Sequence, residues 1–150
     1  MTLNDVLTKQ NVITKLVLTS DKKELPKELK VKIMRVRMAY NKIKKQFDQD
    51  VEEFTKDIVS DELRDLANNN SRNEEQEARF NELNDKVNSE YVEFMSQKGK
   101  EEISDELNDK FTDDEYADIV DINANNDVTI NGNNIKAADF LEAVYELFVA

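Results

Sequence analysis

Residues that break helices are almost absent from this chain. Its 150 residues contain two glycines, Gly99 and Gly132, and one proline, Pro26. Glycine and proline are the residues that most disfavour a helix interior, so a chain with so few of them is expected to be mostly α-helical. Pro26 is itself well placed to open a helix, because the first turn does not use its missing N–H. Neither residue type interrupts residues 27–66.

Two series of apolar residues predict a long helical hairpin. The first follows Pro26 at alternating three- and four-residue steps, a heptad seam: Leu29, Ile33, Val36, Tyr40, Ile43 and Phe47. It continues, displaced by one position, at Val51, Phe54 and Ile58. The second series is Phe80, Leu83, Val87, Tyr91 and Phe94. We expect the two seams to pack against each other as an antiparallel coiled-coil pair.

Polar residues separate the two predicted helices of the hairpin. Residues 68–70 are three consecutive asparagines, which tolerate turn conformations. Ser71 followed by Glu74 has the spacing of a capping box, so we place the start of the second helix there. Gly99 is a natural residue for its C-terminal end.

Shorter elements flank the hairpin. Thr2 and Asp5 have capping-box spacing and open a first helix predicted over residues 2–19. After the hairpin, two short helices are expected. The first has apolar positions Ile103, Leu107 and Phe111, and the second begins at Thr112 with Glu115. Asn131-Gly132 between β-forming residues predicts a two-residue β-hairpin. An amphipathic helix over residues 137–149 follows it.

Together these elements predict a mostly α fold in one elongated domain, residues 1–150. Its parts are an N-terminal helix and loop (1–24), the helical hairpin (25–100), and a C-terminal region with a small β-turn and a helix (101–150). Charged residues make up 36% of the chain and hydrophobic residues 39%. With so few apolar residues, narrow apolar contacts between helices are expected rather than one large hydrophobic core.

The charge is unevenly distributed along this acidic chain, whose 21 basic and 33 acidic side chains give a formal net charge of -12. Residues 1–50 contain 12 basic and 6 acidic side chains, whereas residues 51–150 contain 9 and 27. Opposite charge of this size favours contact between the two parts, either within one chain or between neighbouring copies.

Two residue types that carry much enzyme chemistry are missing. The chain contains no histidine and no cysteine, which removes the commonest general base, the thiolate nucleophile and the usual zinc ligands. It also lacks phosphate-binding glycine loops. We therefore expect no enzyme activity, no cofactor, no metal and no small-molecule substrate.

No apolar run reaches the roughly 18 residues of a membrane span, and Met1–Asp5 do not resemble a signal peptide. The expected place of folding is the cytoplasm.

One segment partly matches the pattern of a calcium-binding loop. Four oxygen-bearing residues fall at positions one, three, five and seven: Asp121, Asn123, Asn125 and Asp127. The sixth position, which needs glycine, is Asn126, and the twelfth, which needs a bidentate glutamate, is Gly132. The favoured interpretation is an asparagine-rich turn before the β-hairpin.

Two features are candidate partner-binding surfaces. The first choice is the C-terminal helix, with Phe140, Val144 and Phe148 as the docking side chains. The second is a basic stripe, Lys30, Arg37 and Lys44, which recurs every seven residues beside the first seam. Four more basic residues widen it: Lys32, Arg35, Lys42 and Lys45. A solvated flank is the favoured interpretation of the stripe. An acidic protein surface is a better candidate ligand than nucleic acid, because the rest of the chain repels a polyanion and the stripe lacks stacking aromatics.

Leu25-Pro26 opens a lysine-rich helix that contains Lys32-Ile33, and an acidic helical stretch, a short strand and a last helix follow. This order resembles a family of small uncharacterised proteins encoded by tailed bacteriophages. The chain departs from that pattern in its longer, asparagine-rich C-terminal part. The resemblance implies a component of a phage particle, in the neck, near the portal or in the tail, assembled in the host cytoplasm from several copies.

Two functions from different classes fit these features. The first is a non-enzymatic structural or assembly protein of a virion, which contacts other virion proteins or copies of itself. The alternative is a soluble acidic regulator or inhibitor of a nucleic-acid-binding protein of host or phage. The first predicts oligomers and abundance in purified particles, and the second predicts a monomer that is absent from them.

Overall fold

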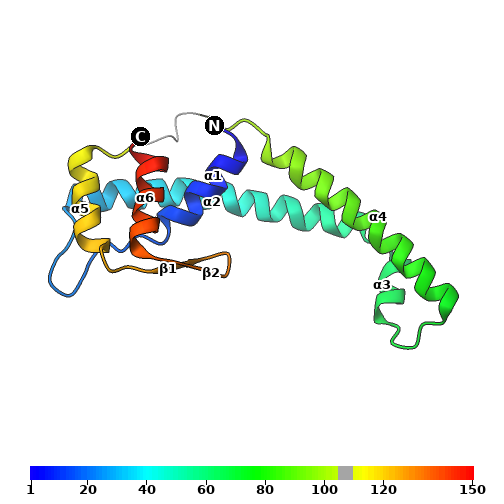
Figure 1. Ribbon diagram of the computed structural model, residues 1–150. Coiled ribbons are helices and arrows are strands. Elements are labelled where there is room, and N and C mark those ends of the chain that lie inside the picture. Colours follow the sequence, from blue (N-terminus) through cyan, green and yellow to red (C-terminus); the bar gives the residue numbers. More distant parts are fainter. Residues whose placement is uncertain (105–109) are drawn as a thin grey trace. The chain divides into compact units, whose positions relative to one another are not determined.

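The structure is a computed structural model that describes residues 1–104 and 110–150 (Figure 1). Within these residues the chain is mostly helical, as the scarcity of glycine and proline predicted. The helices are α1 (Leu3–Ile13), α2 (Lys27–Ile58), α3 (Asp61–Asn68), α4 (Glu74–Gly99), α5 (Asp113–Asn123) and α6 (Ala137–Phe148). The strands β1 (Val128–Ile130) and β2 (Asn133–Ile135) precede α6. The predicted mostly α fold, with a small β element near the C-terminus, is confirmed.

The chain divides into two compact units. Residues 1–44 and 102–150 form the first unit, and residues 45–101 form the second. Helix α2 begins in the first unit and ends in the second. The predicted hairpin segment 25–100 therefore does not form one packed unit, because residues 25–44 belong with the two ends of the chain.

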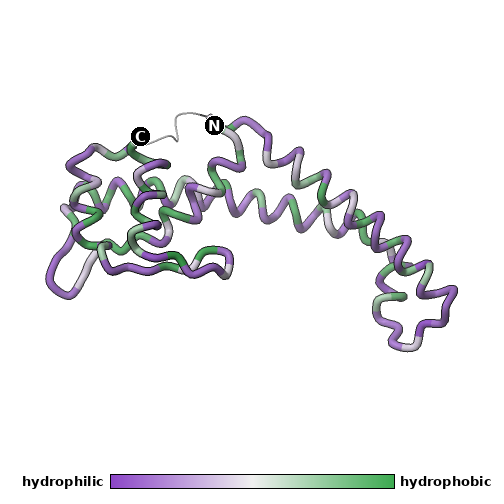
Figure 2. Tube along the Cα trace, in the orientation of Figure 1, coloured by the Kyte–Doolittle hydropathy of each residue, from purple (hydrophilic) through white to green (hydrophobic). Residues whose placement is uncertain are grey.

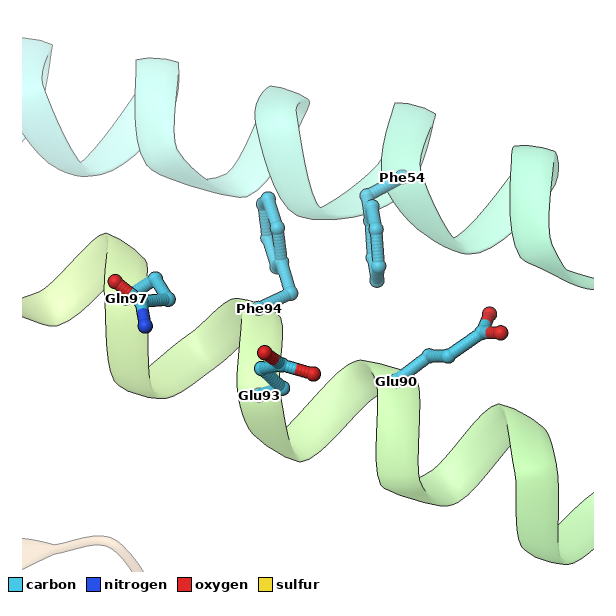
Figure 3. Close-up of a pocket in the computed structure, with 5 residues that line it drawn as sticks. All are labelled: Phe54, Glu90, Glu93, Phe94 and Gln97. Atoms are coloured by element: carbon cyan, nitrogen blue, oxygen red, sulfur yellow. The ribbon is translucent and has the colours of Figure 1, made fainter.

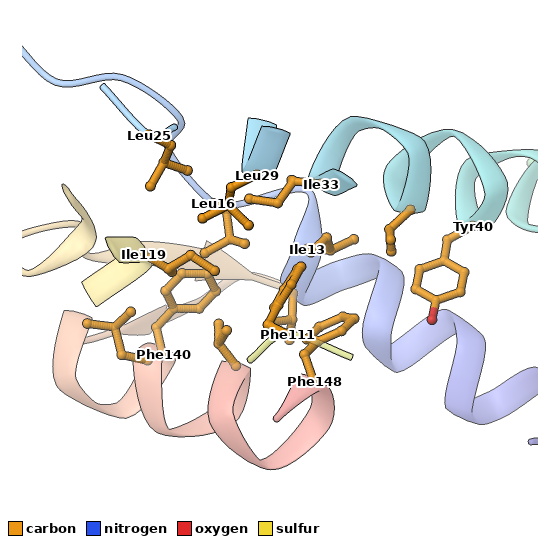
Figure 4. Close-up of a cluster of buried hydrophobic side chains, with 14 of the residues drawn as sticks. Ile13, Leu16, Leu25, Leu29, Ile33, Tyr40, Phe111, Ile119, Phe140 and Phe148 are labelled. Carbon is orange, nitrogen blue, oxygen red and sulfur yellow. The ribbon is translucent and has the colours of Figure 1, made fainter. Parts of the chain in front are cut away.

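The core of the first unit is built from α1, the first part of α2, α5, β1 and α6 (Figure 4). Side chains from these elements and from the segment before α5 converge, among them Ile13, Ile33, Phe111, Ile119 and Phe140. This finding corrects the predicted coiled-coil seam. Ile33, Val36 and Tyr40 of α2 are buried in this core, together with apolar residues of α1 and α6.

The helix starts of the first unit follow the sequence signals. Thr2 and Asp5 form the predicted capping box of α1, and Thr112 and Glu115 form that of α5. Helix α1 ends at Ile13, earlier than the predicted residue 19. Arg37 of α2 explains this end, because its guanidinium binds carbonyl oxygens in the segment that turns away after Ile13.

The β-hairpin forms at the predicted Asn131-Gly132 turn. Both residues have positive φ, 51° and 78°, as a two-residue type I′ turn requires. Strands β1 and β2 are antiparallel, and Val128 pairs with Ile135. The carboxylate of Asp127 accepts a hydrogen bond from the backbone N–H of Ala137 at 2.8 Å, which ties the hairpin to the start of α6.

Opposite charges meet inside the first unit. Residues 1–44 contain 11 basic and 4 acidic side chains, whereas residues 102–150 contain 2 and 13. Lys23 forms an ion pair with Asp121 at 2.7 Å, and Lys32 forms one with Glu115 at 2.9 Å. Part of the charge imbalance seen in the sequence is therefore neutralised within one chain.

The second unit is a small antiparallel hairpin. The ring of Phe54 stacks on that of Phe94, and the Lys98 ammonium lies 2.9 Å from the Asp50 carboxylate. Asp50 lies four residues before Phe54 in α2, whereas Lys98 lies four residues after Phe94 in α4. The two helices therefore run antiparallel. Hydrophobic residues alternate with hydrophilic ones along these helices (Figure 2). The predicted hairpin is confirmed here for residues 45–101.

The turn region of the second unit differs from the prediction in two places. Helix α2 stops at Ile58, and Ser60 caps the separate short helix α3, so the helix is not continuous to residue 66. Asn73 with Gln76, not Ser71 with Glu74, forms the capping box of α4. In both places a polar side chain accepts a hydrogen bond from an otherwise unpaired backbone N–H.

The predicted helix at Ile103, Leu107 and Phe111 falls partly on residues 105–109, so Leu107 lies outside the described residues. Ile103 and Phe111 are described and contribute to the core of the first unit.

Candidate interaction surfaces

The predicted docking helix is part of the core. Phe140, Val144 and Phe148 of α6 are all buried, and they pack against other elements of the first unit (Figure 4). The hypothesis that these side chains dock a partner is therefore corrected. Their spacing marks the buried face of α6, and spacing alone does not distinguish a face that covers the chain's own core from one that covers a partner.

The predicted basic stripe is also largely engaged within the chain. Lys30 forms an ion pair with Glu24. Arg37 donates from Nε to the carbonyl oxygen of Ile13 at 2.9 Å, and from its terminal nitrogen to that of Leu16. Burial lowers the pKa of Arg37 from its usual range. Lys44, the third member, is half-buried and also interacts within the chain. Lys30 and Arg37 thus serve the first unit and do not form a free stripe.

A different face of α2 is exposed and apolar. Val31, Met34 and Met38 have exposed fractions of 46%, 52% and 71%. Their spacing of three and four residues places them on one side of the helix, which we call the methionine ridge. Arg35 and Lys42 flank the ridge and are exposed. Within the part of the chain that the structure describes, neither forms an ion pair or a side-chain hydrogen bond.

The sequence carries a signal for the methionine ridge that lies outside the heptad pattern. Three large apolar residues stand beside the seam in a helix whose polar positions are otherwise mainly basic. Between Glu28 and Asp48, α2 carries no acidic residue. The ridge therefore combines apolar and positively charged groups.

The second unit contains a cleft with an aromatic floor (Figure 3). The rings of Phe54 and Phe94 lie nearly parallel, with centroids 4.0 Å apart and an interplanar angle of 8°. Glu90, Glu93 and Gln97 complete the lining of a cavity of about 300 Å³. We call this site the aromatic cleft. It is apolar at its floor and acidic at its edge.

Two carboxylates set the electrostatics of the aromatic cleft. Glu90 and Glu93 form no ion pair or side-chain hydrogen bond within the described residues. The nearby cation Lys98 is already bound by Asp50, and its hydrogen bond lowers the pKa of the Asp50 carboxyl. Beside the cleft, Val92 is 65% exposed and lines a second hollow on α4 together with Glu93 and Gln97.

The residues of the calcium-loop pattern have other roles. Asp121 pairs with Lys23, and Asp127 accepts the backbone N–H of Ala137. The buried side chain of Asn123 accepts from the Val17 backbone N–H at 2.8 Å. Among residues 1–104 and 110–150 there is no group of three or more acidic side chains placed to hold a metal ion. Nor do those residues include a helix that is long and apolar enough to span a membrane.

Comparison with protein-family models, with curated proteins and with solved structures found no match for this chain.

Proposed function

We propose that the chain is a non-enzymatic structural or assembly protein that works in several copies through protein–protein contacts. The observation that carries this proposal is the methionine ridge. Three large apolar side chains lie together on a helix surface, and a contiguous apolar patch of this kind is characteristic of surfaces that bind other proteins. Methionine, with its flexible and polarisable side chain, adapts well to such contacts.

A tailed-phage particle is the setting that we propose for this assembly. Its support is the resemblance of the lysine-rich helix after Leu25-Pro26, and of the elements that follow it, to small phage proteins. Structural proteins of such particles act in multiple copies, which agrees with a chain that exposes an apolar surface for contact.

The acid surplus of the second unit favours a second candidate, a regulator that presents an acidic face to a nucleic-acid-binding protein. Residues 45–101 contain 16 acidic and 8 basic side chains. One pair of measurements separates the candidates: light scattering of the purified chain over a range of concentrations, and proteomics of purified particles. Oligomers and stoichiometric abundance in particles are expected for the assembly protein. A strict monomer that is absent from particles would contradict it and support the regulator.

A further inference from the structure

We propose that the methionine ridge of one copy binds in the aromatic cleft of a second copy. This inference rests on the proposed function and names the contact through which the copies associate. The ridge is exposed and the two phenylalanines of the cleft are half-buried, both surfaces are apolar at their centre, and the charges beside them have opposite sign.

The ridge offers side chains that fit a cleft. Met34 and Met38 are the most exposed of its three apolar residues, and they project from a helix. The cleft has a volume of about 300 Å³, at the small end of the range for binding pockets, which suits individual side chains of a partner helix. Its floor is the stacked pair Phe54 and Phe94, and methionine sulfur packs favourably against aromatic rings.

The charges around the two surfaces are complementary. Arg35 and Lys42 flank the ridge, and Glu90 and Glu93 rim the cleft. Arg35 and Lys42 are seven residues apart, which corresponds to about 10 Å along a helix. The cleft residues from Glu90 to Gln97 span the same number of residues on α4. The two surfaces therefore extend over equal lengths of helix, although the carboxylates of the cleft are closer together, three residues apart, than the cations of the ridge.

A second copy of this chain is the occupant that these observations favour. Each copy carries one ridge and one cleft, so the contact is heterologous and can extend into a ring or a filament. Two helical turns bury less surface than a stable isolated dimer needs, so a single contact is weak. Repetition of the contact in a closed ring raises the overall affinity. Nucleic acid is a poorer occupant, because exposed apolar side chains interrupt the cations of the ridge.

Charge reversal on each surface tests the contact. The ridge variant is Arg35→Glu with Lys42→Glu, and the cleft variant is Glu90→Lys with Glu93→Lys. Sedimentation velocity at about 50 mM salt, where charge pairs are weakly screened, measures association. We expect each variant alone to associate at least about tenfold more weakly than the wild type. An equimolar mixture of the two is expected to regain association, because every ridge then meets a cleft of opposite charge.

Matched controls carry the same change in net charge elsewhere. Lys15→Glu with Lys22→Glu controls for the ridge variant, and Glu53→Lys with Asp57→Lys controls for the cleft variant. All four are exposed positions. Both controls are expected to associate like the wild type, and circular dichroism verifies that every variant is folded.

The outcomes separate this contact from the proposed function. If the wild type associates but the variants associate equally well, or if their mixture does not recover, the ridge-to-cleft contact is wrong while a multi-copy assembly protein still stands. A wild type that stays monomeric at every concentration overturns this contact. If that monomer is also absent from purified particles, the proposed function falls with it. A last outcome is a wild type that does not self-associate but binds nucleic acid, with a ridge variant that has lost this binding. That result would show that the ridge binds nucleic acid and not a second copy of the chain.

Discussion

Arg37 donates a hydrogen bond from its Nε to the backbone carbonyl oxygen of Ile13, the last residue of α1, across 2.9 Å. A second bond reaches the carbonyl oxygen of Leu16. The last carbonyl groups of a helix lack partners within the helix, so a guanidinium that binds this segment stabilises both the helix end and the turn after it. Through these bonds α2 stabilises the end of α1.

Replacement of Arg37 by alanine is therefore expected to destabilise the first unit. A hydrogen bond to a charged group contributes about 1.5–3 kcal/mol, and two are lost here. We expect the free energy of unfolding to fall by about 2–4 kcal/mol in urea denaturation. Arg35→Ala is the matched control, because Arg35 is exposed on the same helix, and it should change the free energy by less than about 0.5 kcal/mol. Equal effects of the two substitutions would contradict this role of Arg37.

Asn123 is expected to be a second structural polar residue. Its buried amide accepts from the N–H of Val17 and donates to the carbonyl oxygens of Val17 at 3.1 Å and Ile119 at 2.9 Å. Asn123→Ala removes these three bonds and leaves the backbone groups of Val17 without this partner, which we expect to cost about 2–4 kcal/mol in chemical denaturation. Asn125→Ala, at an exposed position nearby, should cost less than about 0.5 kcal/mol. Wild-type stability in Asn123→Ala would show that the amide contributes little.

Local signals predicted local structure well in this chain. The capping boxes at Thr2 and Thr112 and the Asn131-Gly132 turn formed as the sequence indicated, because each depends on neighbours within a few residues. The end of α1 was predicted too late, because the group that binds its last carbonyl is Arg37, which is 24 residues away in the sequence.

Long-range partners were predicted less well, for a physical reason. The heptad spacing of Ile33, Val36 and Tyr40 correctly identified a buried face of the helix. The spacing does not indicate which element packs against that face. In the structure these residues share a core with α1 and α6, and the part of α2 after Lys44 packs with α4. The same ambiguity led to the wrong prediction of Phe140 as a docking residue. The aromatic cleft was not predicted as a site, because it depends on Phe54 and Phe94 coming together from separate helices.

The burial of Phe140 makes a further prediction. Phe140→Ala removes a large side chain from the core of the first unit and is expected to cost about 3–5 kcal/mol of stability. Glu146→Ala on the exposed side of the same helix should cost less than about 0.5 kcal/mol. Thermal and urea unfolding measure both variants. A Phe140→Ala protein of wild-type stability that has lost self-association would restore α6 as a docking element.

The stability of the second unit is expected to depend on pH through Asp50. The hydrogen bond from Lys98, followed by the one from Gln46, lowers the pKa of the Asp50 carboxyl below its ordinary value. A carboxyl whose pKa is lower in the folded state stabilises the fold above its unfolded pKa. That contribution is lost as the pH falls through the folded pKa. The contribution of Asp50 to the stability of the fold should therefore be constant above about pH 5 and should decline below about pH 4.

Asp50→Asn tests this pH dependence, because asparagine keeps the shape of the side chain but does not ionise. Thermal unfolding followed by circular dichroism from neutral pH to about pH 2 is the measurement. The variant should be less stable than the wild type at neutral pH, and the difference should shrink as the pH falls, because the wild-type carboxylate becomes protonated. Asp57→Asn, at an exposed position of α2 without an ion pair within the described residues, should keep the wild-type pH profile. A difference between Asp50→Asn and the wild type that stays the same at all pH values would show that the Lys98 pair does not act through ionisation of Asp50.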